Sequence, residues 1–107
     1  MATLASVAPV ASAVPEFLAE IYVARSDEDA VTLEADRARR AAEALAREGV
    51  PVQHLRAIFV PEDETCLFLY EADSAETVRE AARRAELAFE RVVEAVSVPT
   101  DDRRPDH

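Results

Sequence analysis

The chain has few of the residues that give small proteins special constraints. Its 107 residues include one cysteine, one glycine and no tryptophan. A single cysteine excludes an intrachain disulfide framework and favours a reducing compartment, which we take to be the cytoplasm. Because only four Phe and two Tyr are present, the core must be built mainly from Val, Leu, Ile and Ala. No apolar run approaches the ~18 residues of a membrane-spanning helix.

Lysine is also absent, so all 12 basic residues are arginine, and they face 22 acidic residues for a net charge of −10. An acidic field repels phosphate backbones and anionic lipid, which excludes nucleic acid and membranes as expected partners. The same field attracts cations. At this length one small domain is expected, and its modest core makes oligomerisation a natural supplement.

Both ends of the chain differ from its middle. Residues 1–15 are predicted to be a disordered extension, 16–98 the folded domain and 99–107 a flexible tail. Residues 11–13, Ala-Ser-Ala, imitate a signal-peptide cleavage site, but no basic segment precedes them.

Hydrophobic periodicity predicts alternating strands and helices. Strands are expected at 16–24, 52–60, 65–72 and 91–98, where β-branched and aromatic residues concentrate. An apolar stripe at spacings of three and four predicts a helix from a cap at 26–29 to about residue 48, ended by Gly49 and the following Val-Pro. A second helix is expected from a cap at Asp73 or Ser74 to residues 87–89.

This order is the ferredoxin-like β-α-β-β-α-β sandwich, an α+β fold with both helices on one face of a four-stranded antiparallel sheet. Alternation along each strand divides the side chains into two sets. The uniformly apolar set is expected beneath the helices: Phe17, Ala19, Ile21, Val23, Leu55, Ala57, Phe59, Leu67 and Leu69. The mixed set is expected on the uncovered face: Leu18, Glu20, Tyr22, His54, Arg56, Ile58, Cys66, Phe68, Tyr70, Val92, Glu94 and Val96.

The mixed set is too apolar for a solvated face and too polar for a plain core. We therefore expect a symmetric homodimer whose two sheets pack face to face. Such packing would enclose a ligand pocket lined by Glu20, Tyr22, His54, Arg56, Cys66, Phe68 and Tyr70.

Each polar member of this set has a structural and a functional interpretation. Glu20 and Arg56 most simply form an ion pair, although Glu20 could also be a base or a metal ligand. His54 is either a satisfied interface histidine or a ligand or proton shuttle. Cys66 is expected to be a small buried apolar group, and Tyr22 and Tyr70 to be packing residues. The acidic turn at 62–64 is expected to be solvated, with cation binding as the alternative.

The chain contains no G-x-S-x-G nucleophile elbow, no P-loop, no C-x-x-C and no H-E-x-x-H motif. An RNA-recognition module has the same element order, but the segment T-C-L-F-L-Y-E-A lacks the basic and glycine-aromatic signature of that module.

Four segments resemble a family of small bacterial ferredoxin-like proteins with nickel-binding members: residues 17–25, 41–52 and 55–66, and E-A-A-R-R-A before F-E-R-V-V-E-A-V. The P-E-D-E-T-C block is the most specific of these. The resemblance implies a ferredoxin-like dimer that binds nickel at the dimer surface, with sequestration or homeostasis as its role. His54 with Glu20 is the pair that we expect to hold the metal, since imidazole and carboxylate both suit Ni²⁺.

Two other classes of function stay open. One is a cofactor-independent enzyme or small-molecule binder, for example an isomerase, cyclase or monooxygenase. In that case Glu20 or His54 would be the acid or base, and Arg56 would hold an oxyanion. The other is a dimeric regulatory module that binds neither metal nor small ligand.

Overall fold

A computed structural model of the chain describes residues 14–98. Its elements follow the order β-α-β-β-α-β, and the predicted ferredoxin-like fold is confirmed. The strands are β1 (Glu16–Tyr22), β2 (Val52–Val60), β3 (Thr65–Ala72) and β4 (Phe89–Ala95), and the helices are α1 (Glu28–Arg47) and α2 (Ala75–Arg84). A single 3₁₀ turn, η3 (Pro61–Asp63), joins β2 to β3. The predicted 1–13 part of the extension and the predicted tail lie outside the described residues.

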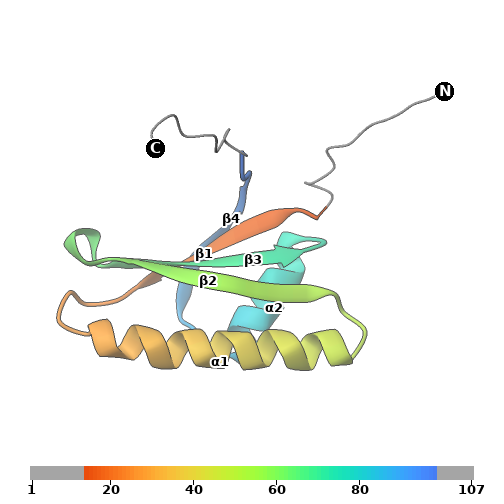
Figure 1. Cartoon of the computed structure of the whole chain (residues 1–107), viewed down its shortest axis with the longest axis horizontal. Helices are drawn as coiled ribbons and strands as arrows, with labels where there is room; N and C mark the ends of the chain where they lie inside the picture. Colours follow the sequence, from red (N-terminus) through yellow and green to blue (C-terminus); the bar gives the residue numbers. More distant parts are fainter. Residues whose placement is uncertain (1–13, 99–107) are drawn as a thin grey trace, which may run out of the picture.

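The four strands form one antiparallel sheet in the order β2-β3-β1-β4. Both helices lie on the same side of this sheet, with α1 running along its length below β2 and β3 (Figure 1). We call the uncovered side the open face. The side chains of the central strands β1 and β3 alternate between the core and the middle of the open face.

The core lies between the helices and the sheet. The apolar stripe predicted for α1 is confirmed, since Ala38, Ala42 and Leu45 are buried. The apolar residues of α2 and of its C-cap are buried as well: Val78, Ala81, Ala82 and Ala85. With so many alanines facing the sheet, the helix backbones can approach the larger side chains of the strands closely.

The two helices end in the same way. Gly49 has φ +98, its N–H donates to Ala46 O, and the N–H of Val50 donates to Leu45 O. After α2 the N–H of Glu86 donates to Arg83 O and that of Leu87 to Ala82 O, with Glu86 at φ 61. A pair of backbone hydrogen bonds around one left-handed residue is the Schellman motif. It ends α2 at Arg84, earlier than predicted, because Glu86 takes the place that glycine has after α1.

The acidic P-E-D-E-T block closes the β2–β3 connection and also holds the start of the loop before α1. Glu64 has φ 49, its carbonyl accepts the N–H of Val23 at 3.1 Å, and its carboxylate accepts the N–H of Arg25 at 2.9 Å. The carboxylate of Glu64 therefore has a structural role, because it holds the loop that leads from β1 to α1.

Candidate functional site

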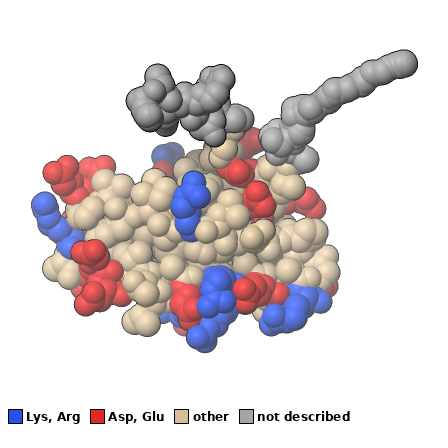
Figure 2. All heavy atoms as spheres, viewed as in Figure 1, with Lys and Arg blue, Asp and Glu red and all other residues tan. Residues whose placement is uncertain are grey.

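The open face has an apolar centre with charged residues around it. The strand register places these residues on it: Glu16, Leu18, Glu20, Tyr22, Gln53, Arg56, Ile58, Val60, Thr65, Leu67, Leu69, Glu71, Arg91, Val93 and Ala95. Ile58 and Tyr22 are 43% and 57% exposed. The side of the molecule in Figure 2 shows charges of both signs gathered along α1 and a mostly uncharged surface over the strands. An uncovered apolar sheet face of this kind is typical of an interaction surface.

Glu20 is paired, but with a different arginine from the one predicted. Arg91 Nη2 lies 2.9 Å from Glu20 Oε2, because the two residues are opposite one another in β4 and β1. The hydrogen bond from Arg91 holds the pKa of Glu20 below its ordinary value. The predicted Glu20–Arg56 pair is therefore wrong. Arg91 was missed because the register of β4 cannot be read from its sequence.

The placement of β3 differs from the prediction. Cys66, Phe68 and Tyr70 lie opposite Ile21, Ala19 and Phe17, so they point beneath the helices, where each has no exposed surface. The residues predicted to be inside, Leu67 and Leu69, lie on the open face. In β4 the prediction is wrong in the same way, since Val92 and Glu94 lie opposite Ala19 and Phe17. Both faces of β3 are apolar, so alternation could not decide which one the helices cover.

The buried members of this set carry polar groups into the core. Burial, with the nearby charge of Glu34, raises the pKa of the Cys66 thiol to about 11. Burial also raises the pKa of Tyr70, whose hydroxyl has no hydrogen-bond partner among residues 14–98. Cys66 thus fits its interpretation as a small buried apolar group.

His54 also lies on the helix side, opposite Tyr70, whereas Arg56 lies on the open face. Its ring centroid is 5.2 Å from that of Tyr70 and 5.5 Å from that of Phe68. The Nε2 atom is buried without a partner among the described residues. Desolvation lowers the pKa of His54, hydrogen bonding to the backbone of Arg56 opposes this, and the charge of Arg39 adds to the lowering.

These placements separate the residues that were predicted to form a metal site and a ligand pocket. Glu20 and His54 lie on opposite sides of the sheet, so one chain does not bring this pair to one metal ion. Within residues 14–98 no three His, Cys, Asp or Glu side chains are grouped to hold a metal. Of the seven predicted pocket residues, the open face keeps only Glu20, Tyr22 and Arg56.

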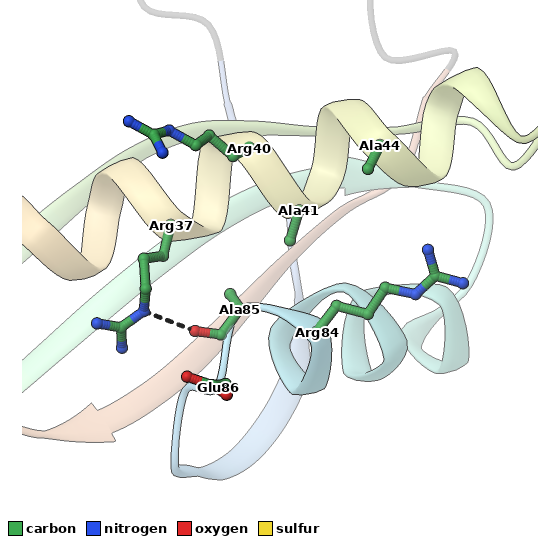
Figure 3. A pocket seen from close by; sticks show the side chains of 7 residues that line it. All are labelled: Arg37, Arg40, Ala41, Ala44, Arg84, Ala85 and Glu86. Carbon is green, nitrogen blue, oxygen red and sulfur yellow. Dashed lines mark hydrogen bonds between the residues drawn. The ribbon is translucent and has the colours of Figure 1, made fainter.

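A cleft of about 370 Å³ lies between α1 and the C-terminal end of α2. Its lining is Arg37, Arg40, Ala41, Ala44, Arg84, Ala85 and Glu86 (Figure 3). Arg37 Nε donates to Ala85 O at 2.9 Å, and Arg84 binds both carboxylate oxygens of Glu48 at 2.7 and 3.0 Å. Arg40 pairs with Asp36 at 2.8 Å. Because each guanidinium already has a protein acceptor, this cleft is a joint between the helices.

Comparison with protein families matches residues 22–95 to the family described as nickel responsive protein SCO4226-like. The chain belongs to this family. The match spans most of the described fold, from the end of β1 to the end of β4, and confirms the resemblance found in the P-E-D-E-T-C block and its neighbours. Neither a curated protein nor a solved structure matches the chain. In the described part of this family member, no helix is long and apolar enough to cross a membrane.

Proposed function

We propose that this chain is a cytoplasmic nickel-binding protein of metal sequestration or homeostasis, and that it works as a homodimer joined through the open face. The observation that supports nickel as the bound metal is the match of residues 22–95 to a nickel-responsive family. The net charge of −10 favours a divalent cation over an anionic ligand.

The apolar centre of the open face supports a dimer. This centre combines Leu18, Ile58 and Leu67, which no helix of the described range 14–98 covers. Two-fold homodimers are the commonest assemblies, and packing two such faces removes the apolar surface of both copies from water at once.

The dimer also bears on how nickel would be held. One chain offers a single described imidazole, at His54, and no group of three donors among residues 14–98. Ni²⁺ accepts imidazole, carboxylate and water ligands. A second copy docked on the open face doubles the carboxylates gathered there, whereas His54 lies on the helix side of each sheet. We therefore propose that nickel is bound by open-face carboxylates from two chains rather than one.

The experiment pairs a monomeric variant with a matched control. Ile58→Glu places a charge at the centre of the open face, whereas Leu33→Glu makes the same kind of change at a 66% exposed site on α1. Sedimentation equilibrium should show a dimer for the wild type and Leu33→Glu, and a monomer for Ile58→Glu. Nickel titration of the same proteins should show weakened binding for Ile58→Glu alone.

His54→Ala then tests the histidine, because an unchanged stoichiometry and affinity would remove it from the ligand set. Nickel affinity no greater than that for Mg²⁺ in the wild type would overturn the metal-binding proposal.

A further inference from the structure

Arg56 brings a charge into the apolar part of the open face. It lies opposite Leu69, which is 7% exposed, and two residues before Ile58. No ion pair joins it to another residue of the described range. If a second copy covers this face, the guanidinium loses water and needs an acceptor, and a carboxylate suits its fork of donors best.

The three carboxylates of the open face differ in whether they are already held. Glu20 is paired with Arg91, and Glu16 accepts a hydrogen bond from the hydroxyl of Ser97. Glu71 has no hydrogen-bond or ion-pair partner for its side chain within residues 14–98. It also lies directly opposite Glu16, and like charges at such positions repel. Of the three carboxylates, Glu71 alone therefore has no partner for its side chain within residues 14–98.

We infer that Arg56 of each copy pairs with Glu71 of the partner subunit, so that two reciprocal ion pairs set the register of the dimer. The inference rests on the proposed dimer. Arg56 lies on β2 opposite Leu69, and Glu71 is two residues further along β3. Because the two positions are near neighbours, a two-fold axis passing over β2 and β3 brings both pairs together at once, as an isologous contact requires.

The open face is small enough for two ion pairs to have a large effect on how two copies dock. Four strands about 4.8 Å apart and seven residues of about 3.4 Å give a footprint of roughly 450 Å². Side-chain relief raises the accessible area towards the ~600 Å² per partner at the lower end of stable interfaces. In an interface this small, two reciprocal ion pairs have a large share in deciding which register and which partner are accepted.

Charge reversal in separate copies tests the inference. Arg56→Glu makes both contacts of its own homodimer acidic, and Glu71→Arg makes both contacts of its homodimer basic. When the two variants are mixed, each contact again joins opposite charges. We expect either variant alone to have a dimer dissociation constant raised at least ~100-fold. The mixture should form a heterodimer within about 10-fold of the wild-type constant.

Two further proteins complete the set. The double variant Arg56→Glu/Glu71→Arg in one chain should form homodimers like the wild type, which shows that neither substitution prevents folding. Arg40→Glu reverses a charge on α1, where Arg40 is paired with Asp36, and should leave the dissociation constant unchanged. Circular dichroism of every variant confirms the fold.

The outcomes separate the possible faults. Single variants that dimerise normally, or a mixture that stays monomeric while the double variant dimerises, would overturn the reciprocal pairing. A wild type that is monomeric at all concentrations would instead remove the proposed dimer itself. If dimerisation requires Ni²⁺ and is lost in Glu71→Gln but kept in Arg56→Gln, a cation at Glu16 and Glu71 takes the place of the arginine, and the inference is wrong.

Discussion

Only one residue separates His54 from Arg56, yet their side chains lie on opposite faces of the sheet. His54 is opposite Tyr70 in β3, whereas Arg56 is opposite Leu69, so the register of β2 shifts between them. Such a bulge adds one residue to a strand and reverses the alternation beyond it. As a result the one described imidazole lies half-buried on the helix side, while the guanidinium two residues later lies on the open face.

Acid should destabilise the protein through His54. Its pKa is lowered from the ordinary 6.5, mainly by burial, so the unfolded chain takes up the proton first. The free energy of unfolding therefore falls as the pH drops below 6.5, and stops falling on this account below the folded-state pKa. Urea unfolding between about pH 7.5 and 5.5 measures the slope. His54→Gln should flatten it, and an unchanged slope in this variant would assign the effect to other groups.

Removal of the Tyr70 hydroxyl should not weaken the fold. The side chain has no exposed surface, and its hydroxyl has no partner among the described residues. A buried hydroxyl without a hydrogen bond costs about 1–3 kcal/mol, so Tyr70→Phe should leave the free energy of unfolding unchanged or raise it by up to about that amount. Chemical denaturation gives the value. A loss of more than ~1 kcal/mol would mean that the hydroxyl is bonded in solution.

Cys66 should resist thiol reagents in the native protein. Its side chain has no exposed surface, and burial raises its pKa to about 11, so the reactive thiolate is scarce. At about pH 8 we expect labelling by a disulfide reagent at least ~100-fold slower in the native protein than in urea. The absorbance of the thiolate released from the reagent measures both rates. Fast labelling of the native protein would show that β3 opens locally.

The two helix ends offer a matched pair of substitutions. Gly49 has φ +98, and a Cβ added there would meet nothing within 4 Å. Gly49→Ala should therefore lower the free energy of unfolding through the backbone alone, by about 1 kcal/mol. Thermal and urea unfolding both report this change.

Glu86→Gly is the converse change, because Glu86 already has φ 61 in the same hydrogen-bonded motif. Relief of the left-handed strain exceeds the entropy that glycine adds to the unfolded chain, so a gain of about 0.5 kcal/mol is expected. If both variants lose stability, the end of α2 does not depend on backbone strain in the way that the end of α1 does.

The element order and the helix faces could be predicted from local signals. Gly49 marks the end of α1, and Ser74 marks the start of α2, where its hydroxyl accepts the N–H of Thr77 at 3.2 Å. The apolar stripes of both helices contain no competing pattern, so only one face of each helix could be buried. Two helices with one apolar face each can cover only one side of the sheet, so the sequence also predicted an uncovered side that could bind a partner.

The residues of the site could be predicted only in part. In β1 the alternation is clear, and Glu20 and Tyr22 lie on the open face as expected. In β3 both alternating sets are apolar, so the register with β1 and not the composition decides that Cys66 is inside and Leu67 outside.

The sequence by itself determined the ferredoxin-like fold and the family, because both depend on local spacing and on short motifs. Only the tertiary structure decided which chemistry each face carries. A register shift in β2 placed His54 on the helix side, and the pairing of β4 with β1 placed Arg91 beside Glu20. A shift of one residue costs little within a strand but transfers every following side chain to the other face, and the strand's own sequence does not record it.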